Sequence, residues 1–126
     1  MNIITRTAAV SFLGLVSAAG LVIGNAATAS AAPTVRSTVT IQAEGTDLFG
    51  TVSSANPTCE ADRKVIVYKQ VGARGGGNDI QFANDTTDDD GEWNTGNTGT
   101  EGKFYAKVKK TSLCKADFSP TITARR

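Results

Sequence analysis

The chain has 126 residues, with 13 Lys or Arg, 12 Asp or Glu, no His and two Cys, and its formal net charge is +1. Proteins that bind nucleic acid or anionic membranes normally carry a clear positive excess, so this balance disfavours both partners. Without histidine a Ser-His-Asp triad is excluded, and two thiolates alone do not complete a tetrahedral metal site. The length fits one domain, and we expect neither a metal nor a cofactor in it.

Residues 1–31 have the pattern of a secretory signal peptide. One cation, Arg6, precedes an apolar run from residue 8 to residue 24, and small residues then end in Ala29-Ser30-Ala31, the Ala-x-Ala pattern of a signal-peptidase site. The competing interpretation is an uncleaved anchor, but this run is shorter than the roughly 20 apolar residues of a membrane span. No cysteine stands near residue 31 to accept a lipid. We therefore predict cleavage, free secretion and a mature domain of residues 32–126, with no membrane attachment afterwards.

The predicted mature domain is neutral overall but unevenly charged. Loss of residues 1–31 removes Arg6 and no acid, which leaves 12 basic and 12 acidic residues. The acids are concentrated between Asp79 and Glu92, and lysines follow between Lys103 and Lys115. We expect two solvated loops or strand faces that partly neutralise each other.

Thr and Val are frequent beyond residue 31, and Gly, Asn and Asp interrupt the chain about every ten residues, which favours strands over helices. In the run 64–71 both faces are apolar, which predicts an interior strand. In the run 103–109 the alternation places Phe104, Ala106 and Val108 inward and lysines outward. A turn is expected at 88–91, with Trp93 buried after it. Seven strands are predicted, at 35–43, 48–53, 64–71, 80–83, 92–94, 103–109 and 121–124. This pattern predicts an all-β fold, a single small antiparallel sandwich.

The cysteines Cys59 and Cys114 are both in the predicted mature domain. In an oxidising compartment, with no third thiol in the chain, they are expected to form one disulfide. Closing a loop of this length stabilises the fold by about 4 kcal/mol on the chain-entropy model.

Several short motifs follow one another in the order found in a known family. They are Phe49-Gly50-Thr51-Val52, then Cys59, then the run 63–68, then Thr87-Asp88-Asp89-Asp90-Gly91-Glu92-Trp93, and then the run 102–108. Over about residues 46–124 the chain resembles secreted bacterial relatives of carboxypeptidase-regulatory-like domains. The resemblance implies an immunoglobulin-like, transthyretin-like sandwich that serves as a non-catalytic accessory, adhesive or binding module.

Two patterns that could carry catalysis are present but poorly placed. Ser112-Leu113-Cys114-Lys115 has the Ser-x-x-Lys spacing of serine acyl enzymes, but it adjoins the predicted disulfide. Paired carboxylates can cleave glycosides, but a domain of this size offers no deep cleft to hold a sugar. The available glutamates are Glu44, Glu60, Glu92 and Glu101. We therefore predict that the protein is not an enzyme.

The acidic turn leaves calcium binding open. Aligned to an EF-hand loop, Asp88 and Asp90 take ligand positions, but Thr86 and Asn97 stand where the first ligand and the closing carboxylate belong. A solvated hairpin turn is expected, and a looser site using Asp85 with these two aspartates remains an alternative.

Four aromatic residues could stack on sugars: Tyr68, Trp93, Phe104 and Tyr105. Alternation places Tyr105 outward, whereas core packing is favoured for Trp93. We expect a secreted, non-enzymatic extracellular binding or structural module whose partner is an unidentified extracellular protein or glycan. The alternative is a carbohydrate- or cell-wall-binding module that uses exposed aromatic side chains.

Overall fold

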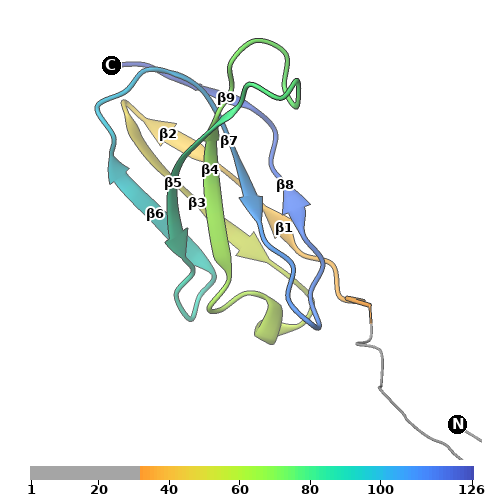
Figure 1. Ribbon diagram of the computed structural model, residues 1–126. Coiled ribbons are helices and arrows are strands. Elements are labelled where there is room, and N and C mark those ends of the chain that lie inside the picture. Colours follow the sequence, from red (N-terminus) through yellow and green to blue (C-terminus); the bar gives the residue numbers. More distant parts are fainter. Residues whose placement is uncertain (1–31) are drawn as a thin grey trace, which may run out of the picture. The chain divides into compact units, whose positions relative to one another are not determined.

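The computed structural model describes residues 32–126, which form two antiparallel β-sheets (Figure 1). The first sheet contains β1 (Thr38–Val39), β2 (Gln42–Glu44), β3 (Asp47–Ser53) and β6 (Glu92–Asn97). The second contains β4 (Lys64–Lys69), β5 (Ile80–Thr86), β7 (Gly102–Val108), β8 (Asp117–Phe118) and β9 (Ile122–Ala124). A 3-10 helix, η1 (Pro57–Cys59), connects the sheets between β3 and β4. The predicted signal peptide lies outside the described residues.

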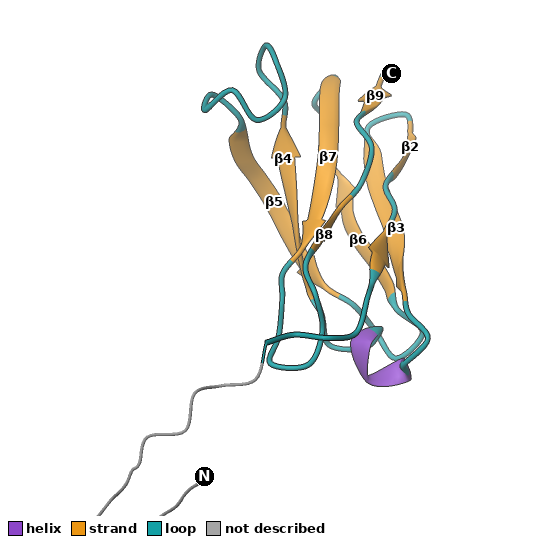
Figure 2. Ribbon diagram, turned by 90° about the vertical axis from the view of Figure 1, so that its right-hand side faces the viewer, coloured by secondary structure: helices purple, strands orange, loops and turns teal. Residues whose placement is uncertain are grey.

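The predicted all-β antiparallel sandwich is confirmed, and Figure 2 shows its two layers from the side. No helix of residues 32–126 has the length and apolar character needed to cross a membrane. The predicted strand count of seven is wrong, because this part of the chain forms nine strands. One extra strand is β8, which has only two residues and therefore shows no alternation to detect. The other arises because the predicted strand 35–43 is broken into β1 and β2.

That break lies at Thr40, whose carbonyl does not take part in the hydrogen bonding between strands. The Thr51 N–H donates to the Thr40 hydroxyl (2.9 Å). The Thr40 carbonyl instead accepts the indole N–H of Trp93 (3.2 Å), which satisfies the buried ring nitrogen. This carbonyl then occupies the space beside Gly50, where a Cβ would lie 2.0 Å from the Thr40 oxygen. Only glycine fits at residue 50.

The core lies between the sheets and is built by strand alternation. Phe104, Ala106 and Val108 are fully buried, as the pattern of β7 predicts, and Trp93 is buried as well. The strand β4 pairs with both β5 and β7, so the predicted interior strand is confirmed, although it ends at Lys69. The core cluster consists of Val39, Ile41, Leu48, Val52, Val65, Val67, Trp93, Phe104, Ala106, Val108 and Ala124.

The predicted disulfide between Cys59 and Cys114 is confirmed, and the two Cα atoms are 5.6 Å apart. It joins η1 to the loop between β7 and β8. Both cysteines are buried. The bond therefore links two segments that are 55 residues apart in the chain.

Next to the disulfide, the side chain of Arg63 is only 1% exposed. Its Nη1 donates to the Ser37 hydroxyl (2.7 Å) and the Cys59 carbonyl (2.6 Å). Its Nη2 donates to the carbonyls of Lys109 (2.8 Å) and Lys115 (3.1 Å). None of the four acceptors is a carboxylate, and burial lowers the pKa of the guanidinium. Arg63 thus holds together the chain segments that surround the disulfide.

Candidate functional site

A row of aromatic rings crosses the outer face of the second sheet. Tyr68 of β4 and Tyr105 of β7 are cross-strand partners, and their rings stack with centroids 5.3 Å apart and an interplanar angle of 18°. Phe118 of β8 continues the row, with its centroid 6.4 Å from that of Tyr105. We call these three residues the aromatic row. Such cross-strand aromatic pairs stabilise the sheet and also create a flat apolar strip on it.

The loop of residues 70–79 covers the middle of the aromatic row. The guanidinium carbon of Arg74 lies 4.2 Å from the Tyr105 ring centroid. The Tyr105 hydroxyl donates to Oδ2 of Asp79. The same carboxylate accepts the backbone N–H groups of Val71 (3.2 Å) and Gly75 (3.0 Å), which folds the loop back onto the sheet. Tyr105 therefore points outward, as predicted, but is only 6% exposed.

Neither the Tyr105 phenol nor the Asp79 carboxylate changes its protonation state near neutral pH. Burial, with the hydrogen bond to Asp79, raises the pKa of Tyr105 to about 12. The hydrogen bond from Tyr105, with those from the loop backbone, lowers the pKa of Asp79. The phenol is thus neutral and the carboxylate ionised over the same wide pH range. A general acid or base needs a pKa near the working pH, so this pair is suited to holding the loop and not to proton transfer.

The exposed end of the aromatic row is Phe118. Its side chain is 52% exposed, whereas every other aromatic side chain of residues 32–126 is buried or half-buried. Lys107, its cross-strand partner, places its ammonium nitrogen 5.4 Å from the ring centroid. Ile80 is also 52% exposed, but its register with Lys69, the partner of inward Phe104, places it on the other side of the sheet. The outer face thus presents one aromatic ring to solvent beside a cation.

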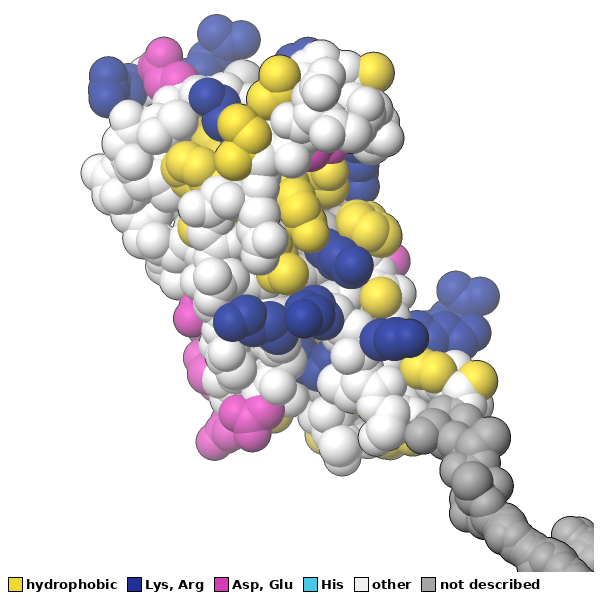
Figure 3. Space-filling model, in the orientation of Figure 1, with side chains coloured by type: hydrophobic (Ala, Val, Ile, Leu, Met, Phe, Trp, Pro, Cys, Tyr) yellow, Lys and Arg dark blue, Asp and Glu magenta, His cyan; other side chains and the backbone are white. Residues whose placement is uncertain are grey.

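The outer face of the second sheet is cationic. Alternation places Lys64 on the same side of β4 as Tyr68. It places Lys107 of β7, and Lys109 directly after the end of β7, on the same side as Tyr105. Lys64 and Lys109 are neighbours, because the Lys109 N–H donates to the Lys64 carbonyl (2.9 Å). Figure 3 shows Lys and Arg side chains grouped across the lower half of this face, with hydrophobic side chains above them.

The acidic residues of these strands do not offset the lysines. The strands of the second sheet contain only two acids, Asp85 and Asp117. Each accepts a backbone N–H from the first sheet: Asp85 from Asn94 (2.8 Å) and Asp117 from Val39 (2.9 Å). Both carboxylates therefore point away from the outer face. We call the outward side chains of Lys64, Tyr68, Tyr105, Lys107, Lys109 and Phe118 the cationic face.

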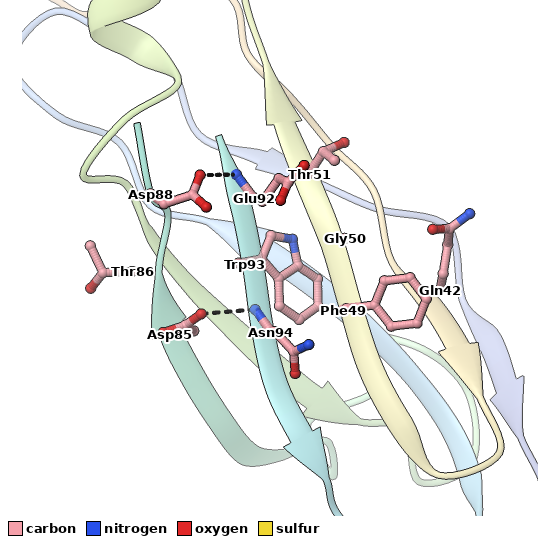
Figure 4. A pocket seen from close by; sticks show the side chains of 10 residues that line it. All are labelled: Gln42, Phe49, Gly50, Thr51, Asp85, Thr86, Asp88, Glu92, Trp93 and Asn94. Atoms are coloured by element: carbon pink, nitrogen blue, oxygen red, sulfur yellow. Dashed lines mark hydrogen bonds between the residues drawn. The ribbon is translucent and has the colours of Figure 1, made fainter. Parts of the chain in front are cut away.

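A second candidate is a groove of about 440 Å³ beside β3, β5 and β6 (Figure 4). Two of its three acids accept backbone N–H groups: Asp85 from Asn94, and Asp88 from Asp90 and Glu92 (both 2.9 Å). The bonds to Glu92 and Asn94 satisfy donors along the edge of β6 that β3 does not reach, and so protect an edge strand from pairing with another chain. The groove is lined by Gln42, Phe49, Gly50, Thr51, Asp85, Thr86, Asp88, Glu92, Trp93 and Asn94.

The groove does not contain the metal site or the sugar-stacking site considered from the sequence. Within residues 32–126, no group of three or more acidic or thiol side chains is arranged to hold a metal ion. Trp93, a proposed stacking residue, is 2% exposed, and Phe104 is fully buried, so neither is available to a sugar. The predicted hairpin turn at the aspartates is present, closed by the Gly91 N–H donating to the Asp88 carbonyl (3.0 Å).

The residues considered for catalysis are scattered. Ser112 and Lys115 are exposed on the loop between β7 and β8, on either side of buried Cys114. Two of the four glutamates accept backbone N–H groups: Glu60 from Ser54 and Glu101 from Arg126. The four lie on four separate segments of the fold. We found no arrangement that unites them in the described part of the chain.

Three comparisons, with models of known protein families, with curated proteins and with solved structures, find no match. The resemblance to carboxypeptidase-regulatory-like domains therefore remains a prediction from short motifs.

Proposed function

We propose that the protein is a secreted, non-enzymatic binding module and that its ligand-binding surface is the cationic face. The observation that carries the proposal is Phe118, a 52% exposed ring beside Lys107 on the outer face of the second sheet. Leaving such a side chain in solvent gains no stability from burial, and exposed apolar surface bordered by polar groups is typical of interaction sites.

Two features support the extracellular location. A disulfide persists in oxidising compartments and is rare in reducing ones, and Cys59 and Cys114 are paired here. The Ala-x-Ala pattern at residues 29–31 would release the domain at its described N-terminal end. Both agree with export, and the proposed bacterial origin rests on the motif resemblance alone.

The non-enzymatic role is supported by how the ionisable groups are used. The titrating pair Tyr105 and Asp79 is fixed in one protonation state near neutral pH, and Asp85 and Asp88 are bound to backbone N–H groups. A sandwich that exposes a flat face fits the accessory, adhesive or binding role implied by the resemblance to carboxypeptidase-regulatory-like domains.

A carbohydrate- or cell-wall-binding module remains the alternative proposal, but the aromatic residues that would stack on the sugar are different. Phe118 and half-buried Tyr68 take over the stacking role, because Trp93 and Phe104 belong to the core. A glycan and a protein surface are both compatible with one exposed ring beside lysines.

The test is cosedimentation of the purified oxidised protein with isolated cell envelope of the producing organism. Phe118→Ala is expected to reduce retention about fivefold or more, as for a central aromatic contact. Leu113→Ala is the matched control, since this exposed side chain lies on the loop before Cys114 and outside the strands of the cationic face. Equal retention of the two variants and the wild type would show that the cationic face is not the binding surface.

A further inference from the structure

We infer that the ligand of the cationic face is an acidic polysaccharide, that is, a sugar polymer bearing carboxylate or phosphate groups. This inference rests on the proposed function and names the class of ligand. It is argued from charge, from the aromatic row and from the spacing of the lysines.

The positive charge is concentrated locally on the cationic face. Lys64, Lys107 and Lys109 point outward from adjacent strands, while Asp85 and Asp117 of the same sheet bind backbone N–H groups of the other sheet. The screening length is about 8 Å at physiological ionic strength, so a ligand on this face senses these lysines far more than acids elsewhere on the domain. The cationic face therefore attracts an anion even though residues 32–126 contain 12 basic and 12 acidic residues.

The nearest acid to the aromatic row is Asp79, and it is already occupied. Its carboxylate accepts the Tyr105 hydroxyl and the N–H groups of Val71 and Gly75. Arg74, from the same loop, lies over the Tyr105 ring, and its positive charge offsets the negative charge of Asp79. Asp79 thus fixes the loop, and because Arg74 offsets its negative charge, the net attraction for an anionic ligand comes from the lysines.

The aromatic row explains why the anion is expected to be a sugar. A surface that selects only for negative charge needs no exposed ring, yet Phe118 is held beside Lys107, with the ammonium 5.4 Å from the ring centroid. The apolar C–H face of a pyranose can lie on Phe118 while an acidic substituent reaches Lys107. One ring and one cation then recognise the two parts of the same sugar unit.

The spacing of the cations favours a polymer over a small molecule. Lys107 lies on β7 and Lys109 directly follows its end at Val108, so the two residues are about 7 Å apart along the extended chain. Lys64 lies beside Lys109 on β4, so the cations extend along and across the sheet. The groove of about 440 Å³ lies beside β3, β5 and β6, not on the cationic face. An extended chain that crosses several strands fits a flat face of this kind.

The experiment measures binding of the purified oxidised protein to polygalacturonate, a carboxylated polysaccharide, with neutral dextran as the uncharged comparison. Binding is expected to polygalacturonate only and to weaken with salt. The triple variant K64Q/K107Q/K109Q is expected to bind about tenfold more weakly, since exposed ion pairs contribute little singly but add up. Phe118→Ala should lose about fivefold.

A matched triple variant, R36Q/R125Q/R126Q, removes the same charge from exposed positions outside the strands of the cationic face. It should bind within about twofold of the wild type, because screening limits the reach of distant charges. Equal losses in the two triple variants would contradict the inference, since net charge alone would then govern binding. Circular dichroism and melting curves check that each variant is folded.

Three further probes identify other classes of ligand: polyglutamate, single-stranded DNA and phosphatidylglycerol vesicles. If any of them binds as tightly as polygalacturonate and Phe118→Ala leaves binding unchanged, the face recognises charge only and the inference is wrong. If polygalacturonate does not bind while envelope retention still depends on Phe118, the inference fails and the proposed function stands. If envelope retention is also independent of Phe118, both fail.

Discussion

Arg63 is expected to be among the most sensitive positions of the domain. Its guanidinium makes four hydrogen bonds of 2.6 to 3.1 Å, one to a hydroxyl and three to carbonyls. In Arg63→Ala these acceptors lose their donors inside the fold. Each buried polar group without a partner costs about 1–3 kcal/mol, and water entering the vacated space recovers part of that cost. The free energy of unfolding should therefore fall by about 4 kcal/mol.

For a domain of this size the total stability is about 5–14 kcal/mol. A loss of about 4 kcal/mol lowers the melting temperature by about 20 °C. Arg63→Lys retains the charge but cannot reach all four acceptors at once, and is expected to lose about 2 kcal/mol. Urea denaturation followed by circular dichroism measures both losses.

The control is Arg36→Ala, which removes an exposed arginine and should change stability by less than about 0.5 kcal/mol. If Arg63→Ala unfolds within about 1 kcal/mol of the wild type with an unchanged denaturant slope, the four hydrogen bonds do not hold the fold as we argue.

Three other predictions test separate parts of the structure. Gly50→Ala places a methyl group 2.0 Å from a backbone oxygen and should lower the free energy of unfolding by about 3 kcal/mol, so an unchanged urea midpoint would refute the packing described. Absorbance at 295 nm should show Tyr105 ionising near pH 12 rather than near 10, a transition absent in Tyr105→Phe. Because the pKa of Tyr105 is higher in the folded than in the unfolded state, the stability that this phenol contributes is complete below about pH 10 and is lost between about pH 10 and 12. A Tyr105 transition near pH 10 would contradict this. Reduction of the Cys59–Cys114 disulfide should cost about 4 kcal/mol of stability, and a reduced protein as stable as the oxidised one would refute its stabilising role.

The fold class follows from alternation, which is a local property of the sequence. The inward side chains of β7 and the buried Trp93 are recognisable because neighbouring positions alternate in polarity. The disulfide follows from having only Cys59 and Cys114 to pair. The break between β1 and β2 was missed because it depends on the indole of Trp93, which is 53 residues away in sequence.

The candidate site was only partly predictable. Alternation correctly places Tyr105 outward, but it cannot show that Arg74 and Asp79 cover the ring, since a Gly-rich loop can leave a sheet in many directions. Phe118 was missed because β8 is too short to show a period. The outward lysines of β7 were predicted. That Asp85 and Asp117 point away from the cationic face is visible only in their contacts with the other sheet.

The most direct test of the proposed binding surface is to map amide chemical shifts of the oxidised protein during titration with polygalacturonate. The account predicts that the perturbed amides cluster on β4, β7 and β8, around Lys107 and Phe118. Perturbations concentrated on β3 and β6 instead, around the groove that contains Phe49 and Glu92, would contradict it.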